Sequence, residues 1–165
     1  MFECDIQLII KQYTRSITTI SRYDYPLKWP SITAQITNAL TSGNERGIMT
    51  GLLSLFALTK KYEYEMDEDR EPLFGIMESM FPLLGNIIET YMTQNENLMG
   101  LALLHMVCKV FYVANQLYIC PMLKNEGALG PWMQFFKYVL DCPPPENLSN
   151  FVEEMDEIYA RDKSI

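Results

Sequence analysis

The chain has 165 residues, which is long enough for one domain with a hydrophobic core of its own. Hydrophobic residues make up 48% of it and charged residues 21%, a composition that excludes an intrinsically disordered chain. The net charge is −8 and Lys and Arg do not cluster, which argues against nucleic acid as a direct partner. An acidic surface suits basic protein ligands, and it suits plain solubility equally well.

Cysteine usage and the N-terminal residues both indicate an intracellular protein. Four cysteines occur without any CxxC or other close pair: Cys4, Cys108, Cys120 and Cys142. This spacing predicts reduced thiols rather than a disulfide framework or a zinc site. No N-terminal stretch combines a basic flank, an apolar core and a cleavage site, so no secretory signal is expected.

The most apolar run, residues 98–117, has nearly the length of a membrane span. It carries His105, Lys109 and Asn115, which a lipid-facing helix would not hold. We therefore predict a helix that its neighbours bury on most sides, and no membrane insertion.

In chain order, apolar periodicity predicts helices and no strands. Residues 5–23 place Ile6, Ile9, Tyr13 and Ile17 at steps of three or four, which gives one apolar face. Further helices are expected at residues 29–40, 45–62, 71–92, 98–118, 131–140 and 147–159, with a short helical piece after Pro121. No segment alternates convincingly between apolar and polar residues, so the predicted fold class is all-α.

Prolines mark where several of these helices begin. Pro26 and Pro30 start the second helix and Pro72 starts the fourth, where a missing N–H costs no helical hydrogen bond. Pro82 falls inside the fourth helix and is predicted to kink it. The charged residues 66–71, between the third and fourth helices, are predicted to form a loop.

The helix starts recur at a nearly constant interval. Pro26 to Pro72 spans 46 residues (72 − 26), and Pro72 to Pro121 spans 49 (121 − 72). Intervals of about 40–47 residues with two helices per unit are typical of HEAT and armadillo repeats. We therefore predict an α-α superhelix, a HEAT/armadillo-like solenoid with about three helix pairs. The single segment 1–165 would divide into the units 1–23 (partial), 24–65, 70–118 and 121–160.

Few residues could support catalysis or metal binding. His105 and Cys108 are three residues apart and share a helix face, so a Cys–His pair is geometrically possible. A lone histidine on an apolar face is more often a hydrogen-bonded core residue, and we favour that interpretation. The acidic run at 67–71 lacks the glycine and the closing glutamate of a calcium loop. No enzyme activity, cofactor or metal is expected.

Several short motifs occur in an order that resembles a known family. They are DYPLKWP at 24–30, KKYEYE at 60–65, EDREPL at 68–73 and FPLL at 81–84, followed by the stretches 108–123 and 131–145. Over residues 6–145 the chain resembles the importin-β (karyopherin-β) superfamily, in the branch that contains importins seven and eight. A single motif such as DYPxxW is weak, whereas several in this order over most of the chain are more specific.

The resemblance implies a stack of HEAT repeats, roughly the third to sixth, from a soluble nuclear transport receptor that shuttles between cytoplasm and nucleus. Such receptors are not enzymes. They bind protein cargo and FG-repeat nucleoporins, and they respond to the GTP-bound form of the small GTPase Ran. The second helix of each pair lines the concave side, here residues 5–23, 45–62 and 98–118. Polar positions near these helices are candidate partner contacts: Lys60, Lys61, Glu63 and Lys109.

Three alternatives stay open at this point. A HEAT scaffold without a transport role would share the fold and the repeat length, but not the order of the motifs. An exportin of the same superfamily lies between such a scaffold and an importin. The third alternative is an α-helical enzyme that uses Cys108 and His105. Uncovered apolar surface at the ends of such a segment could also drive self-association.

Overall fold

The structure, a computed structural model, describes residues 2–94 and 97–141 and divides after Leu129 into two compact units. The first unit contains five α-helices: α1 Phe2–Asp24, α2 Ile32–Leu40, α3 Glu45–Lys60, α4 Glu71–Tyr91 and α5 Leu98–Asn115. It also contains two short 3₁₀ helices, η1 Asp67–Arg70 and η2 Pro121–Lys124. No strand occurs within the described ranges, and the predicted all-α class is confirmed.

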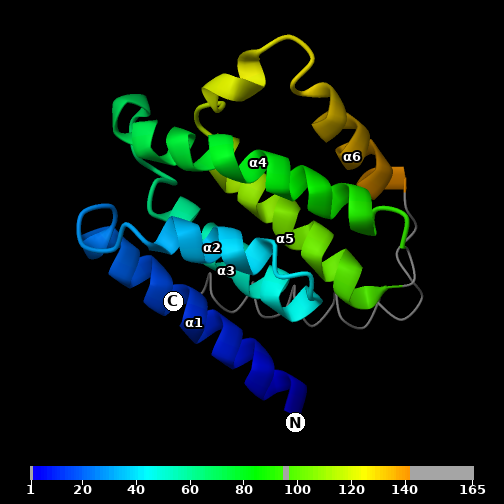
Figure 1. The fold of residues 1–165 in the computed structure, drawn as a ribbon, viewed down its shortest axis with the longest axis horizontal. Helices are drawn as coiled ribbons and strands as arrows, with labels where there is room; N and C mark the ends of the chain where they lie inside the picture. The colour runs from blue at the N-terminus through cyan, green and yellow to red at the C-terminus, as the bar shows by residue number, and fades with distance from the viewer. Residues whose placement is uncertain (1, 95–96, 142–165) are drawn as a thin grey trace, which may run out of the picture. The chain divides into compact units, whose positions relative to one another are not determined.

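The helices of the first unit form two layers (Figure 1). α1, α3 and α5 run in the same direction, and α3 contacts both α1 and α5. α2 and α4 run back the other way, and each packs against the helix that follows it, α2 on α3 and α4 on α5. We call α1, α3 and α5 the inner layer, and α2 and α4 the outer layer. Two helix hairpins stacked in sequence order confirm the predicted HEAT-like solenoid.

The second unit is described by one helix, α6, which spans Gly130–Asp141. It is amphipathic: Trp132 and Phe135 are buried, while Met133 and Lys137 are exposed. The other helix of the predicted third pair, residues 147–159, lies outside the described residues.

The core of the first unit lies between the two layers. Fully buried side chains come from the facing sides of α3, α4 and α5: Leu52, Leu55, Leu58, Leu73, Met77, Leu84, Leu103, Val107 and Val110. Burying one side chain of this size contributes about 1.5–3 kcal/mol, so this set fixes how the layers pack. The rings of Phe81 and Phe111, with centroids 6.0 Å apart, join α4 to α5. α4 continues through Pro82 as one helix, and the kink expected there stays a prediction.

The start of α2 differs from the prediction. The helix begins at Ile32 rather than at residue 29. Trp29 precedes Pro30, whose ring disfavours helical backbone at the residue before it. The N–H of Trp29 instead donates to the carbonyl oxygen of Asp24 at 3.0 Å, which closes a turn after α1. The two prolines therefore precede the second helix and do not lie in its first turn.

α3 and α5 end two or three residues earlier than predicted, at Lys60 and Asn115. After α5 the side-chain oxygen of Asn115 accepts a hydrogen bond from the backbone N–H of Cys120 at 3.0 Å. Such a side-chain bond offers the backbone a turn in place of a further helical turn. The predicted loop at 66–71 contains the 3₁₀ helix η1, so that part of the prediction was wrong.

α3 and α5 begin in the same way, with an asparagine N-cap and a glycine three residues later. The side chain of Asn44 accepts a hydrogen bond from the N–H of Gly47 at 2.7 Å, and that of Asn97 accepts one from Gly100 at 3.0 Å. A Cβ on Gly100 would lie 2.8 Å from Cδ1 of Tyr91, so only glycine lets α5 start this close to the end of α4. Asn-x-x-Gly therefore recurs after 53 residues (97 − 44), at the starts of two successive inner helices.

Candidate protein-interaction surface

The C-terminal ends of two inner helices are joined by the side chain of Arg70, which is fully buried. Its Nη1 donates to the carbonyl oxygens of Tyr62 at 3.1 Å and Glu63 at 3.4 Å, just after α3. Its Nη2 donates to the carbonyl oxygens of Ala114 at 2.7 Å and Val113 at 3.5 Å, in the last turn of α5. The positive guanidinium therefore caps the negative ends of two helix dipoles at once.

This arrangement fixes the inner layer at one end. Burial lowers the pKa of Arg70, yet a guanidinium starts so high that it stays charged at neutral pH. The ring of Tyr118 lies 5.9 Å from Cζ of Arg70, and Gln116 also donates to the Glu63 carbonyl oxygen at 3.4 Å. Sequence patterns place Arg70 in a solvated acidic loop. The one available signal was a single cation, the fourth residue of the acidic run DEDRE.

Three of the four predicted contact residues lie together at the end of α3. Lys60 Nζ is 2.6 Å and 2.7 Å from the two carboxylate oxygens of Glu63, and it lies 5.7 Å from the centre of the Phe56 ring. Only 8% of Glu63 is exposed. Both side chains are therefore engaged within the chain, and their contact with a partner stays a prediction.

Lys61 is held at the turn that follows α1. Its Nζ donates to the carbonyl oxygen of Tyr25 and lies 5.5 Å and 5.1 Å from the ring centres of Tyr25 and Tyr62. Burial lowers the pKa of Lys61, and the nearby charge of Glu65 opposes that shift. The side chain thus holds the loop after α1 against the end of α3. A role for Lys61 in partner binding also stays a prediction.

Lys109 lies apart from these three residues, on α5. It is half-buried and close enough to His105 that its charge lowers the histidine pKa, in addition to the larger effect of desolvation. His105 itself is exposed, so the interpretation of a core histidine was wrong. The reason is rotational: α5 turns positions 103, 106 and 107 toward its neighbours and position 105 away from them.

The pairing of His105 with Cys108 gains no chemical support. Burial raises the pKa of the Cys108 thiol to about 11. A thiol with that pKa stays protonated at neutral pH, whereas a nucleophile needs the thiolate. His105 is neutral at the same pH, and a neutral imidazole cannot stabilise a thiolate by charge.

The solvent-facing sides of α3 and α5 carry largely apolar side chains. Residues on these sides recur at helical steps of three and four. We call them the inner face: Arg46, Met49, Leu53, Phe56 and Lys60 on α3, with Leu98, Leu101, His105, Lys109 and Tyr112 on α5. All are exposed or half-buried, and Tyr112 is 64% exposed. α3 and α5, which carry the two rows, contact each other.

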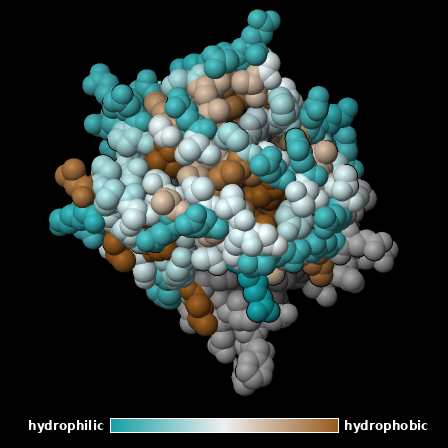
Figure 2. Space-filling view, viewed as in Figure 1, coloured by the Kyte–Doolittle hydropathy of each residue, from teal (hydrophilic) through white to brown (hydrophobic). Residues whose placement is uncertain are grey.

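A shallow hollow opens where the end of α2, the start of α3 and α4 meet. Its lining is apolar with a polar rim: Leu40, Thr41, Ile48, Leu83, Asn86, Ile87 and Thr90. Figure 2 shows apolar side chains gathered in the middle of this face, between α2 and α4, with polar residues around them. The hollow can accept an apolar side chain from a partner.

Two features of the described residues bear on metal and membrane binding. In residues 2–94 and 97–141 no three His, Cys, Asp or Glu side chains come together as a metal site would require. α5 is long and apolar enough to cross a membrane by length and composition. Its buried residues, among them Leu103, Val107 and Val110, lie in the core where α5 packs against α3 and α4.

Stacked helix hairpins with an exposed, largely apolar inner face define an α-solenoid of the HEAT type. The chain is also similar in sequence to known proteins. The chain is 30% identical over 152 residues to Importin-8 of Mus musculus, covering 92% of the chain and 15% of that protein. It is 30% identical over 135 residues to an Importin beta-like SAD2 homolog of Arabidopsis thaliana, covering 81% and 13%. It is also 28% identical over 117 residues to Exportin-2 of Danio rerio, covering 65% and 12%.

The chain belongs to the importin-β (karyopherin-β) superfamily, in the branch that contains importins seven and eight. This is a family of nuclear transport receptors, and these relatives are not enzymes. No family model and no solved structure matches the chain. The chain spans only 12–15% of the length of the three relatives named above.

Proposed function

We propose that this chain is a segment of a nuclear import receptor that binds protein cargo and is regulated by Ran-GTP. The main support is its relation to importins over 92% of its length, together with an exposed inner face on stacked helix hairpins. The receptor would shuttle between cytoplasm and nucleus and pass the nuclear pore. No catalytic step belongs to this function, because binding and release of the cargo are sufficient.

In this mechanism the solenoid would change its curvature elastically. Each hairpin contacts only its neighbours, so small changes between hairpins add up to a change in curvature. The link from Arg70 to the ends of α3 and α5 is where one hairpin is joined to the next. Cargo and Ran-GTP could then compete through different preferred curvatures, which is a coupling between two sites.

The hollow between α2 and α4 suggests how the receptor would contact FG nucleoporins. Its apolar lining from Leu40, Leu83 and Ile87 suits a phenylalanine side chain, and the polar rim suits the peptide backbone beside it. It opens on the outer layer, away from the inner face. Cargo and nucleoporins could therefore bind at the same time.

A second candidate is an exportin-type receptor of the same superfamily, which the match to Exportin-2 of Danio rerio favours. The two functions differ in how Ran-GTP acts on cargo. In an importin Ran-GTP displaces the cargo, whereas in an exportin it strengthens cargo binding.

The test is binding of the longest product of the gene to Ran loaded with a non-hydrolysable GTP analogue and, separately, with GDP. Biolayer interferometry should show clear preference for the GTP form. Adding the GTP form to a captured cargo complex should release the cargo from an importin and retain it on an exportin. Equal or absent binding of the two Ran forms would overturn the receptor proposal and leave a HEAT scaffold.

A further inference from the structure

One tyrosine combines high exposure with a place outside the helices. Tyr64 is 81% exposed and lies four residues after the end of α3 (64 − 60), in the turn that leads to η1. Among the described residues, the other strongly exposed tyrosines belong to helices: Tyr23 to α1, at 79%, and Tyr112 to α5, at 64%. An enzyme that modifies a tyrosine holds the backbone around it in an extended form. It can therefore reach Tyr64 without unwinding a helix.

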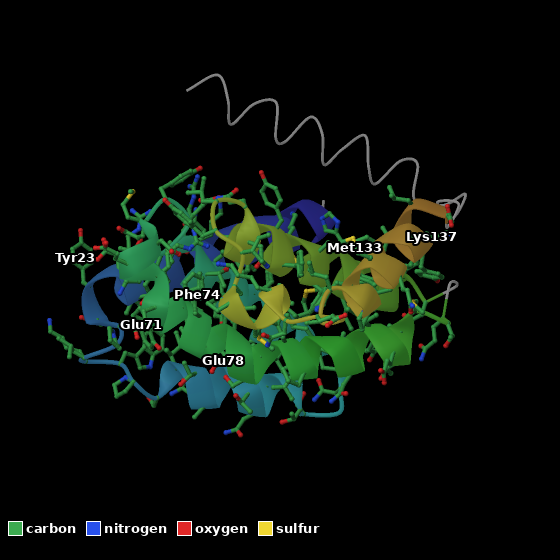
Figure 3. The ribbon with its side chains drawn as sticks, turned by 90° about the horizontal axis from the view of Figure 1, so that it is seen from above. Tyr23, Glu71, Phe74, Glu78, Met133 and Lys137 are labelled. Atoms are coloured by element: carbon green, nitrogen blue, oxygen red, sulfur yellow. The ribbon has the colours of Figure 1, made fainter. Side chains whose placement is uncertain are left out.

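The residues around Tyr64 also set it apart by charge. Glu63 and Glu65 flank it, and η1 begins with three further carboxylates, all of them exposed. Tyr23, in contrast, follows a cation, Arg22. Figure 3 shows Tyr23, near the end of α1, and Glu71, the first residue of α4, at the same end of the first unit. An enzyme with a basic substrate groove would therefore favour Tyr64 over Tyr23.

The stretch from the end of α3 to the start of α4 contains three cations, and each already has a partner within the chain. Lys60 pairs with the carboxylate of Glu63 at 2.6 Å. Lys61 donates to a carbonyl oxygen in the turn after α1, and Arg70 donates to carbonyl oxygens at the ends of α3 and α5. A new anion on Tyr64 could gain one of these cations only by drawing it away from its present contacts.

A phosphate on Tyr64 would stand in an unfavourable place. It would add a charge of about −1.5 to −2 beside Glu65 and just beyond the C-terminal end of α3, where the helix dipole is negative. Single backbone hydrogen bonds hold this turn: the N–H of Glu65 donates to the carbonyl oxygen of Tyr62 at 3.3 Å, and that of Glu63 donates to Lys60 at 3.4 Å. The carbonyl oxygens of Tyr62 and Glu63 are the ones that Arg70 binds.

We propose that Tyr64 is a phosphorylation site and that its phosphate loosens the link between the two hairpins, which Arg70 makes through the carbonyl oxygens of Tyr62 and Ala114. A protein tyrosine kinase transfers the γ-phosphoryl group of ATP to Oη of Tyr64. The bond from the γ-phosphorus to its bridging oxygen breaks, ADP leaves, and the phenolic proton passes to the catalytic carboxylate of the kinase.

The phosphate then acts on the turn in two ways. It repels the carboxylates beside it, and it attracts the cations that hold the turn in place. Both effects weaken the contacts by which the end of α3 is joined to the end of α5. The inference goes beyond the proposed function and does not depend on it, since neither cargo nor Ran takes part.

The first experiment measures which tyrosine is phosphorylated. The full chain is incubated with ATP and a recombinant tyrosine kinase that phosphorylates a Glu-Tyr copolymer, and phosphopeptides are quantified by mass spectrometry. The initial rate at Tyr64 should exceed that at Tyr112 by about ten-fold, because α5 must open locally before Tyr112 can react. Tyr64→Phe should lose most of the incorporated phosphate, and the matched control Tyr112→Phe should keep it.

The second experiment measures the effect of the phosphate by hydrogen exchange with mass spectrometry. Peptides that cover residues 58–66 and 111–116 should exchange about three-fold faster in the phosphorylated chain, since they contain the two helix ends that Arg70 joins. Peptides that cover α2 should exchange at the same rate in both forms. Tyr64→Phe, treated with the same kinase, controls for phosphate on other tyrosines and should exchange as the unmodified parent does.

Three results would overturn the inference. They are a rate at Tyr64 no higher than that at Tyr112 while the copolymer is phosphorylated, full phosphate incorporation in Tyr64→Phe, and unchanged exchange at both helix ends after phosphorylation. These failures are separable from failure of the proposed function, because Ran-GTP preference is measured on the unphosphorylated protein.

Discussion

Nη2 of Arg70 donates a hydrogen bond to the carbonyl oxygen of Ala114 at 2.7 Å, although 44 residues separate them. Nη1 of the same guanidinium reaches the Tyr62 carbonyl oxygen at 3.1 Å. One side chain therefore joins the ends of two inner helices that belong to successive hairpins. The exposed acidic turn around it, Asp67–Asp69, is positioned by a residue that solvent does not reach.

Arg70→Ala should lower the free energy of unfolding by about 3 kcal/mol, because it leaves several buried carbonyl oxygens without donors. Arg70→Lys should lose less, since an ammonium is charged but cannot donate as a planar fork to both helix ends. Urea denaturation followed by circular dichroism measures both. Glu68→Gln, on the exposed side of the same turn, is the control and should change stability by less than about 0.5 kcal/mol. Equal stability of Arg70→Ala and the control would contradict this structural role.

The helices and their pairing could be predicted from the sequence, because the buried face of an amphipathic helix carries an apolar residue at every third or fourth position. The role of Arg70 could not, since its partners are backbone carbonyl oxygens that lie in no sequence pattern. His105 illustrates a second limit. Its neighbours in α5 are apolar on almost every side, so periodicity does not show which way position 105 points.

The candidate site, too, could be predicted only in part from the sequence. Position on the inner helices pointed to the end of α3, where Lys60 pairs with Glu63 and Lys61 donates to the carbonyl oxygen of Tyr25. Contact of these residues with a partner stays a prediction. The contact of Lys61 with Tyr25 depends on how the turn after α1 packs, since 36 residues separate the two. To predict the apolar inner face, one must know which sides of the helices the outer layer covers, and only the packing of the helices shows this.

The N-cap of α5 offers a test of the contact between hairpins. Asn97→Asp keeps an acceptor for the N–H of Gly100 but places a second carboxylate beside Glu45, which Asn97 contacts at 2.7 Å. Stability should fall by about 1 kcal/mol, because the hydrogen bond to Glu45 is lost and a like-charge contact replaces it. Adding Glu45→Gln should restore it, as measured by urea denaturation.

Asn44→Asp is the matched control, because Asn44 caps α3 in the same way through Gly47. A carboxylate at a helix N-terminus interacts favourably with the dipole, so this variant should be neutral or slightly stabilising. A loss of similar size in both variants would show that Glu45 is not the cause.

Alkaline pH should lower the free energy of unfolding, because the buried thiol of Cys120 holds its proton more tightly in the folded state. Burial raises the pKa of Cys120 to about 11 from a usual value near 9. Between these values the unfolded chain loses the thiol proton while the folded chain keeps it, so the unfolded state binds fewer protons and stability falls as pH rises. Unfolding free energies at pH 8.5 and 10.5 should therefore differ less in Cys120→Ala than in the parent. An unchanged difference would show that this thiol does not contribute. The tyrosines that also titrate in this range are common to both proteins and cancel in the comparison.

Filling the hollow between α2 and α4 should block binding of FG peptides without disturbing the inner face. Thr90→Trp places a large ring at the rim of the hollow from an exposed position, so it should not strain the core. A peptide with two Phe-Gly pairs separated by polar residues should bind the parent weakly and bind Thr90→Trp at least five-fold more weakly by nuclear magnetic resonance titration. Thr50→Trp, also exposed but on α3, is the control and should keep the parent's affinity. If both variants bind equally well, the peptide contacts another surface, and the hollow has no part in passage through the pore.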